Sequence, residues 1–194
     1  MADQNNKPAL NPPNVQPVEI KLEDFFTKVL SVIGRTTDQQ ISDLLKKSNQ
    51  TVSVAESITG GLISNRLTNI PGSSEYFIGG IVCYSPRIKV VQVGVPAALI
   101  SQYGAVSKEV AVSLAEEIRK RFRTDIGISA TGVAGPAPIP PAPVGKAYIA
   151  LASNREAEWK ELNLQGTRAE IREKAAQAAL GLLWLYLGGE EVLK

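Results

Sequence analysis

The hydrophobic positions between residues 51 and 187 change repeatedly from strand-like to helix-like spacing. Short β-branched and apolar runs predict strands at 51–57, 77–85, 125–130, 146–152 and 158–166, the last two joined as a hairpin. Apolar residues three and four positions apart predict helices at 60–69 and 97–103, a helical turn at 89–93, a long helix capped by Ser107 and a last helix opened by Thr167. Strands that alternate with helices predict an α/β fold, a three-layer α/β sandwich with a mixed β-sheet in a single domain.

The first fifty residues have a different pattern. Residues 1–17 are rich in Asn, Gln and Pro and predict a disordered tail. Residues 18–50 predict an N-terminal helical extension, because apolar residues recur at helical spacing over 22–34 and 38–48. The α/β domain is then expected at 51–187, followed by a C-terminal tail at 188–194.

Two features of the composition limit the chemistry. The chain has no histidine and one cysteine, Cys83. A Ser-His-Asp triad, a Cys-His pair and a Cys/His zinc site are therefore excluded within this chain, as is an internal disulfide. The formal net charge is +2, and the short basic cluster at 119–123 is interpreted as the solvated end of a helix rather than a nucleic-acid-binding patch.

The sequence predicts neither a secretory signal nor a membrane span. The first residues are polar and contain no apolar core of a secretory signal, and no stretch reaches the roughly 18 apolar residues of a membrane span. A cytoplasmic protein with no membrane or nucleic-acid partner is expected by elimination.

Candidate chemistry follows three predicted strands. The loops at 56–61, 84–89 and 131–136 each combine polar side chains with glycine or proline. Ligands of open α/β folds gather beyond the carboxyl ends of the strands, so these loops are expected to meet at one site. Each loop also has a simpler interpretation: a Ser/Thr helix cap, a surface lysine and a plain turn, respectively.

Seven ordered motifs give these loops a context. They are AESITGG (55–61), LTNIPGSSEYF (67–77), GGIVCYS followed by a lysine (79–89), GVP (94–96), YGAVS (103–107), TGVAGP (131–136) and PVG (143–145). Over about residues 40 to 187 the chain resembles the C-terminal domain of the competence-damage protein CinA, the nicotinamide-nucleotide amidase family. The resemblance implies hydrolysis of nicotinamide mononucleotide to nicotinic acid mononucleotide and ammonia, without a metal or another cofactor. A small-molecule nucleotide is the expected partner, and a homo-oligomer the expected assembly.

The resemblance places the family's nucleophile on Ser57, its catalytic lysine on Lys89 and its helping hydroxyl on Thr131. The residues support these roles. A serine hydroxyl needs a base, and a lysine whose pKa is lowered, by burial or by a nearby cation such as Arg87, can provide one when histidine is absent. Thr131 is expected to orient Lys89 or to relay its proton.

The remaining candidate residues are expected to bind substrate. Backbone N–H groups at Gly60 and Gly61 would stabilise the oxyanion, and Tyr84 would stack on the pyridine ring. Arg168 and Arg172 would bind the phosphate, although two solvated helix-face arginines are an equal alternative. The full expected binding set is Thr59, Gly60, Gly61, Tyr84, Gly132, Arg168 and Arg172.

The chain departs from the family pattern at two places. Ile58 stands where the family usually has cysteine, and its side chain is expected to pack in the core. The segment 136–143 reads PAPIPPAP where the family has a glycine-rich, acidic stretch, and proline removes N–H donors. This loop favours the alternative function, a nucleotide-binding or regulatory module without turnover. The family's upstream phosphoanhydride-hydrolysing domain would not fit in residues 1–50, so that activity is not expected of this chain.

Overall fold

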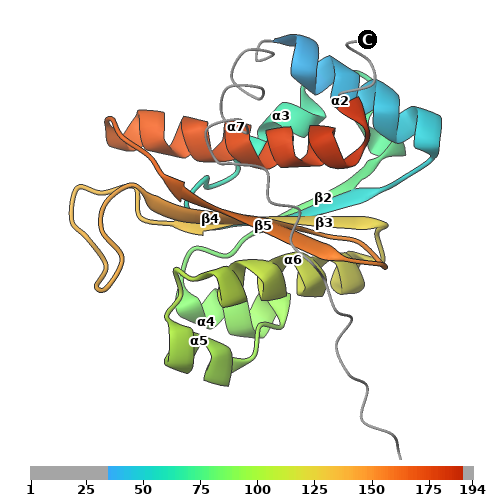
Figure 1. Ribbon diagram of the computed structural model, residues 1–194. Coiled ribbons are helices and arrows are strands. Elements are labelled where there is room, and N and C mark those ends of the chain that lie inside the picture. The colour runs from blue at the N-terminus through green and yellow to red at the C-terminus, as the bar shows by residue number, and fades with distance from the viewer. Residues whose placement is uncertain (1–34, 190–194) are drawn as a thin grey trace, which may run out of the picture.

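The computed structural model describes residues 35–189, which form one sheet covered by helices on both faces (Figure 1). The strands are β1 (Val52–Glu56), β2 (Phe77–Val82), β3 (Ile126–Gly132), β4 (Lys146–Ala152) and β5 (Ala157–Asn163). The helices are α2 (Arg35–Ser48), α3 (Leu62–Thr68), α4 (Pro86–Ile88), α5 (Ala97–Tyr103), α6 (Lys108–Phe122) and α7 (Arg168–Tyr186), with a 3₁₀ turn η1 (Ser73–Glu75) and a π-helical turn η2 (Lys89–Val93).

The sheet is mixed, with the strand order β2-β1-β3-β4-β5. β1 lies parallel to β2 and to β3, whereas β3–β4 and β4–β5 are antiparallel. The β4–β5 hairpin is the one predicted from sequence. Because the three parallel strands are neighbours, their carboxyl ends lie at the same edge of the sheet.

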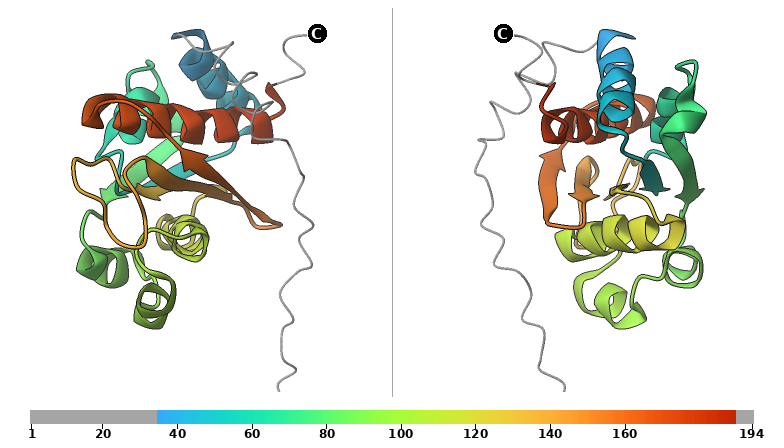
Figure 2. Two further views of the ribbon diagram at one scale, coloured as in Figure 1. Left: turned by 60° about the vertical axis from the view of Figure 1, so that its left-hand side comes forward. Right: turned by 90° about the vertical axis from the view of Figure 1, so that its right-hand side faces the viewer.

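Three layers are visible in Figures 1 and 2: α2, α3 and α7 cover one face of the sheet, and α4, α5 and α6 cover the other. The larger core lies under the first group and includes Val54, Ile128, Ile149 and Trp184. A second core lies under α6 and includes Leu114 and Ile118. The predicted three-layer α/β sandwich is therefore confirmed. No helix within residues 35–189 is long and apolar enough to cross a membrane.

The strand and helix boundaries differ from the sequence prediction by a few residues. β1 and β2 end at Glu56 and Val82, so the polar residues placed at their ends belong to loops. The predicted helix at 38–48 begins earlier, at Arg35. The predicted tail at 1–17, the predicted helix at 22–34 and most of the C-terminal tail lie outside the described residues.

Helix α2 packs as a full part of the domain. Ile41 and Leu45 are completely buried in the core that also contains β1 and α7, and the Trp184 indole N–H donates to Gln40 Oε1 at 2.9 Å. The sequence-based division between residues 50 and 51 therefore cuts through a single core. Amphipathic periodicity identified the helix but not the surface that it covers.

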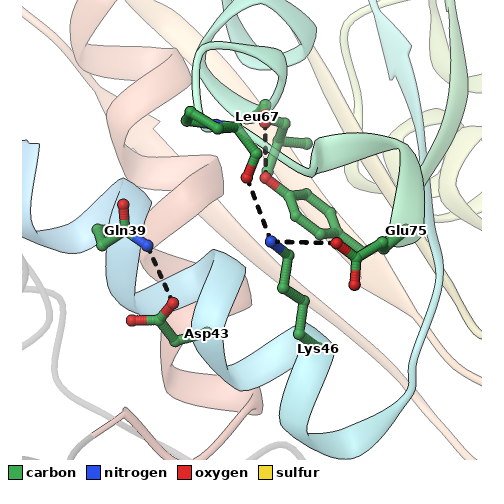
Figure 3. Close-up of polar contacts among 7 residues, drawn as sticks. Gln39, Asp43, Lys46, Leu67 and Glu75 are labelled. Carbon is green, nitrogen blue, oxygen red and sulfur yellow. Dashed lines mark hydrogen bonds and ion pairs between the residues drawn. The ribbon is translucent and has the colours of Figure 1, made fainter.

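Polar contacts fasten α2 to the segment between α3 and β2. Figure 3 shows Lys46 extending from α2 toward this segment, where its Nζ lies 3.5 Å from Glu75 Oε1 and donates to the carbonyl oxygen of Pro71 at 3.2 Å. Nearer the start of α2, Arg66 of α3 binds both carboxylate oxygens of Asp38, at 2.6 and 3.0 Å. Their side chains are only 18% and 16% exposed, so the Arg66–Asp38 pair is largely shielded from water.

We expect Asp38→Ala to lower the free energy of unfolding by about 2 kcal/mol, because it leaves the Arg66 guanidinium partly buried without its bidentate partner. Asp43→Ala is the matched control on the same helix, since Asp43 is exposed and, among the described residues, accepts a hydrogen bond only from Gln39 (Figure 3). The control should change the value by no more than about 0.5 kcal/mol. Urea denaturation of both variants measures the difference, and equal effects would show that the buried pair adds nothing.

Candidate active site

The loops that follow β1, β2 and β3 come together at the carboxyl edge of the parallel strands. The Ser57 backbone N–H donates to the Ala130 carbonyl at 2.9 Å, and the Cys83 N–H donates to the Glu56 carbonyl at 2.7 Å. These bonds extend the sheet by one residue beyond β1 and β2. The sequence prediction that the three chemistry-bearing loops share one site is consistent with this arrangement.

Ser57 and Lys89 form a buried side-chain pair. Lys89 Nζ is hydrogen bonded to Ser57 Oγ at 2.8 Å and donates to the Cys83 carbonyl oxygen at 2.6 Å. Lys89 is 1% exposed and Ser57 7% exposed. Lys89 is the first residue of the π-helical turn η2 (Lys89–Val93), and π-helical turns are frequent at functional sites.

Burial lowers the pKa of the Lys89 ammonium below its ordinary value of 10.5, and the nearby Cys83 side chain opposes this shift. Among the described residues, no carboxylate forms an ion pair or hydrogen bond with Lys89. Arg87, which the sequence offered as a second cause, makes no contribution to the shift. Burial alone therefore favours the neutral amine, which is the form that can accept a proton.

Thr131 lies near the end of β3, directly after Ala130, whose carbonyl accepts from the Ser57 N–H, and it is 1% exposed. Its hydroxyl donates to the carbonyl oxygen of Ala105 at 2.8 Å, which fixes the segment before α6 against the sheet. A hydroxyl that donates one hydrogen bond can still accept another. The predicted role of Thr131 as an orienting group for Lys89 stays a prediction.

The Glu56 carboxylate caps the N-terminus of α3. The fully buried Glu56 carboxylate accepts hydrogen bonds from the backbone N–H groups of Gly61, Ile63 and Ser64 and from the Ser64 hydroxyl, at 2.6 to 3.1 Å. The Gly61 N–H is therefore not available to an oxyanion, and the prediction is wrong for Gly61. The spacing of Glu56 from α3 does not follow the usual capping pattern, which explains why sequence reasoning found only a general structural role.

The N–H groups that precede Gly61 are the remaining donors near the nucleophile. Within residues 35–189 the structure gives the N–H groups of Ile58, Thr59 and Gly60 no hydrogen-bond partner. The Thr59 hydroxyl is also buried without a partner. Gly60 has a left-handed φ of 59°, and a Cβ there would lie 3.1 Å from the Arg172 guanidinium, so glycine permits this close turn. Donors toward an oxyanion are therefore expected at Thr59 and Gly60.

Gly132 has a clear packing role, and its predicted contact to substrate stays a prediction. A Cβ at this position would lie 2.6 Å from the Ala147 Cβ and 2.8 Å from the Ile58 side chain. Ile58 is 4% exposed and belongs to the larger core, as predicted. The glycine thus allows β3, β4 and Ile58 to pack closely behind Ser57.

Two arginines on one side of α7 connect the three loops. Arg172 donates to the Thr59 carbonyl at 2.9 Å. Arg168 donates to the Gly135 carbonyl and, at 2.7 Å, to the Tyr84 hydroxyl. Neither guanidinium pairs with a carboxylate among the described residues. The structure brings Tyr84 and both arginines to the same loops, and their predicted contacts to substrate stay predictions. The sequence could not show that backbone carbonyls hold both arginines.

A metal centre finds no support in the part of the chain that the structure describes. No group of three or more His, Cys, Asp or Glu side chains lies close enough there to hold a metal ion.

The structure defines this chain as a three-layer α/β domain with a buried serine–lysine pair at the carboxyl ends of its parallel strands. The family model for the CinA C-terminal domain matches residues 35–187. The chain belongs to the CinA C-terminal domain family.

Individual relatives agree with this family. A CinA-like protein of Dictyoglomus thermophilum is 46% identical over 152 residues, which cover 77% of this chain and 37% of that protein. The chain thus spans well under half the length of that relative. Among solved structures, a competence/damage inducible protein from Agrobacterium tumefaciens superposes with a TM-score of 0.74 and 30% identity, over 80% of this chain and 97% of the other. A competence or damage-inducible protein from Enterobacter asburiae gives 0.77 and 26%, over 79% and 97%.

Proposed function

We propose that this chain is an amidohydrolase that converts nicotinamide mononucleotide and water to nicotinic acid mononucleotide and ammonia. The observation that supports the proposal is the contact between Ser57 Oγ and Lys89 Nζ, 2.8 Å apart and shielded from water. A buried lysine without a carboxylate is costly for a fold to maintain, and such groups cluster at functional sites.

The proposed reaction has two halves. Ser57 Oγ attacks the carboxamide carbon while the neutral Lys89 amine takes the hydroxyl proton, and N–H groups at Thr59 and Gly60 stabilise the oxyanion. Lys89 then gives the proton to the departing amine, which leaves as ammonia. Water then attacks the resulting ester with Lys89 again as base. This step releases the acid product and regenerates free Ser57.

The positive charge of two arginines near Ser57 supports an anionic substrate. Arg168 and Arg172 lie one helical turn apart on α7, and both reach the loops around Ser57. Guanidinium groups that contact only neutral oxygens keep the capacity to bind a phosphate. Tyr84 is 62% exposed and bonded to Arg168, so it is placed to contact the ring of a nucleotide held there.

The direct experiment is to incubate the purified chain with nicotinamide mononucleotide and to measure ammonia and nicotinic acid mononucleotide, with and without a chelator. Equal amounts of both products, released at a chelator-independent rate, support the proposal. Turnover that stops with the chelator would contradict the metal-free mechanism.

Arg168 provides a test of substrate class. We expect Arg168→Ala to raise KM for nicotinamide mononucleotide about 10- to 100-fold, the value of one charge-assisted hydrogen bond. The KM for nicotinamide riboside, which lacks the phosphate, should stay within about twofold. Lys174→Ala is the matched control, because Lys174 is an exposed cation on the same helix whose one hydrogen bond within residues 35–189 goes to the Gln165 carbonyl. Equal losses with both substrates would assign Arg168 a purely structural role.

A second candidate is a nucleotide-binding module without turnover, which the loop at 136–143 favours. This loop consists largely of proline and is exposed apart from Ala142, and its first neighbour, Gly135, is held by Arg168. Calorimetric binding of the nucleotide with no release of ammonia would favour the module over the enzyme.

A further inference from the structure

A buried carboxylate lies directly beside the proposed nucleophile. Glu56 is the last residue of β1, is 0% exposed and precedes Ser57 in the chain. None of the described residues forms an ion pair with it. Helix starts are usually capped by a small Ser, Thr, Asp or Asn side chain, and a buried charge is costly unless hydrogen bonds compensate it. A buried glutamate is thus a costly cap for one short helix.

Both oxygens of the Glu56 carboxylate are fully used. Oε2 accepts from the Gly61 and Ile63 N–H groups at 2.8 and 3.1 Å, and Oε1 accepts from the Ser64 N–H and hydroxyl at 2.9 and 2.6 Å. An amide nitrogen donates and cannot accept. A glutamine at this position would therefore turn its NH₂ group toward at least one backbone N–H, whichever way the amide is oriented.

These bonds fix the turn between β1 and α3. At the start of the turn, the Ser57 N–H donates to the Ala130 carbonyl at 2.9 Å. At its end, the Glu56 carboxylate holds the Gly61 N–H. The N–H groups of residues 58–60 lie between these two points and have no partner among the described residues. Anchors at both ends keep these donors in one orientation, and preorganised donors are what stabilises an oxyanion.

The position of Glu56 also bears on the proposed base. The Glu56 carbonyl accepts from the Cys83 N–H at 2.7 Å. The Cys83 carbonyl accepts from Lys89 Nζ at 2.6 Å, and Nζ is hydrogen bonded to Ser57 Oγ at 2.8 Å. These contacts form a ring that begins and ends at the adjacent residues Glu56 and Ser57. A displacement of Glu56 would therefore move the base together with the donors.

We propose that Glu56 is a positioning residue, whose carboxylate holds the donors of residues 58–60 and the Ser57–Lys89 pair in the geometry that the oxyanion needs. The inference rests on the proposed amidase function, because it assigns a role within that reaction. Glu56 itself does not touch the substrate. Preorganised donors act in the transition state, so their displacement should lower kcat and leave KM nearly unchanged.

Glu56→Gln tests this role in the purified chain. We expect kcat for ammonia release from nicotinamide mononucleotide to fall about 100-fold, as for a displacement of reacting groups by roughly 1 Å, while KM stays within about threefold. Ser64→Ala is the matched variant, because it removes one hydrogen bond from the same carboxylate and keeps the three backbone bonds. Its kcat should stay within about threefold of the wild type.

A second control separates positioning from stability. Ser53 lies near the other end of β1, is fully buried, and its hydroxyl is bonded to the Thr124 hydroxyl at 2.7 Å. Ser53→Ala should lower the melting temperature and leave kcat unchanged well below that temperature. If Glu56→Gln lowers only the melting temperature and keeps the wild-type kcat, the proposal is wrong. A loss of kcat in Ser64→Ala as large as in Glu56→Gln would also overturn it.

Reaction with phenylmethanesulfonyl fluoride provides a readout without nucleotide turnover. The serine oxygen bonds to sulfur, and fluoride leaves with the hydroxyl proton as HF. Intact mass spectrometry follows the reaction, and Ser57→Ala identifies the modified serine. Oxyanion donors also speed this reaction, so Glu56→Gln should react about tenfold more slowly or less. A wild type that reacts faster than Glu56→Gln but releases no ammonia would contradict the amidase proposal alone. Equal rates in both proteins, including no reaction in either, would overturn the role of Glu56.

Discussion

Ser57→Ala is expected to lower kcat for ammonia release by about 10⁴-fold or more, because it removes the only atom that forms the covalent bond in the proposed reaction. Binding of the nucleotide should persist, since the loss of one small, 93% buried hydroxyl leaves the loops and arginines in place. A steady-state assay of ammonia, together with calorimetric titration of the nucleotide, separates these two effects.

Ser85→Ala is the matched control for this substitution. Ser85 also follows a strand at the same edge of the sheet, but its side chain is exposed and caps the short helix α4 by accepting from the Ile88 N–H at 3.3 Å. The Ser85 variant should keep nearly the full rate. Ammonia release by Ser57→Ala at the wild-type rate would remove Ser57 as the nucleophile and make the buried Thr59 hydroxyl the next to test.

The strands and helices of this fold could be predicted because their signals are local. The β-branched runs of β1 and β3 and the capped start of α7 are visible within a few residues, and the capping box of Thr167 and Glu170 is present. The packing of α2 was not predictable in the same way. Its amphipathic pattern shows that one face is buried, but the partners that bury it, such as Trp184, are far away in the sequence.

The candidate site shows the same contrast between features that follow from local sequence and contacts that do not. Ser57 and Lys89 follow β1 and β2, and Thr131 lies near the end of β3. The carboxyl ends of these parallel strands lie at one edge of the sheet, so the placement of all three residues at that edge follows from topology. The groups that hold them are backbone carbonyls, of Cys83 for Lys89 and of Ala105 for Thr131, and a carbonyl has no signature in sequence. The error at Gly61 has the same origin, because its N–H was assigned to substrate without knowledge that the Glu56 carboxylate reaches it.

Lys89→Met should abolish turnover and at the same time stabilise the fold near neutral pH. Methionine fills a similar volume and needs no hydrogen bond, whereas the buried amine of Lys89 must do without the hydration of its charged form. The free energy of unfolding should therefore rise, by about 1.4 kcal/mol for each unit by which folding lowers the pKa of Lys89. Thermal and urea denaturation measure this gain, and the ammonia assay measures the loss of activity.

The pH dependence gives this prediction its sign. In the unfolded chain Lys89 has its ordinary pKa of 10.5, and folding lowers it. Between these two values the unfolded chain binds a proton that the folded chain does not, so the wild type loses stability as pH falls. The advantage of Lys89→Met should thus be largest at and below the lowered pKa and vanish as pH rises toward about 10.5. The kcat/KM of the wild type should rise with pH through the lowered pKa of Lys89 and level off above it, because the neutral amine is the base.

Lys89→Arg separates charge from packing. A guanidinium stays protonated under these conditions and cannot accept the Ser57 proton, so this variant should be inactive at every pH and less stable than Lys89→Met. A pH-independent rate in the wild type, or a methionine variant that is less stable than the wild type at pH 7, would show that Lys89 is held as a cation. The buried amine would then be a structural group, and Ser57 would lack a base in this chain.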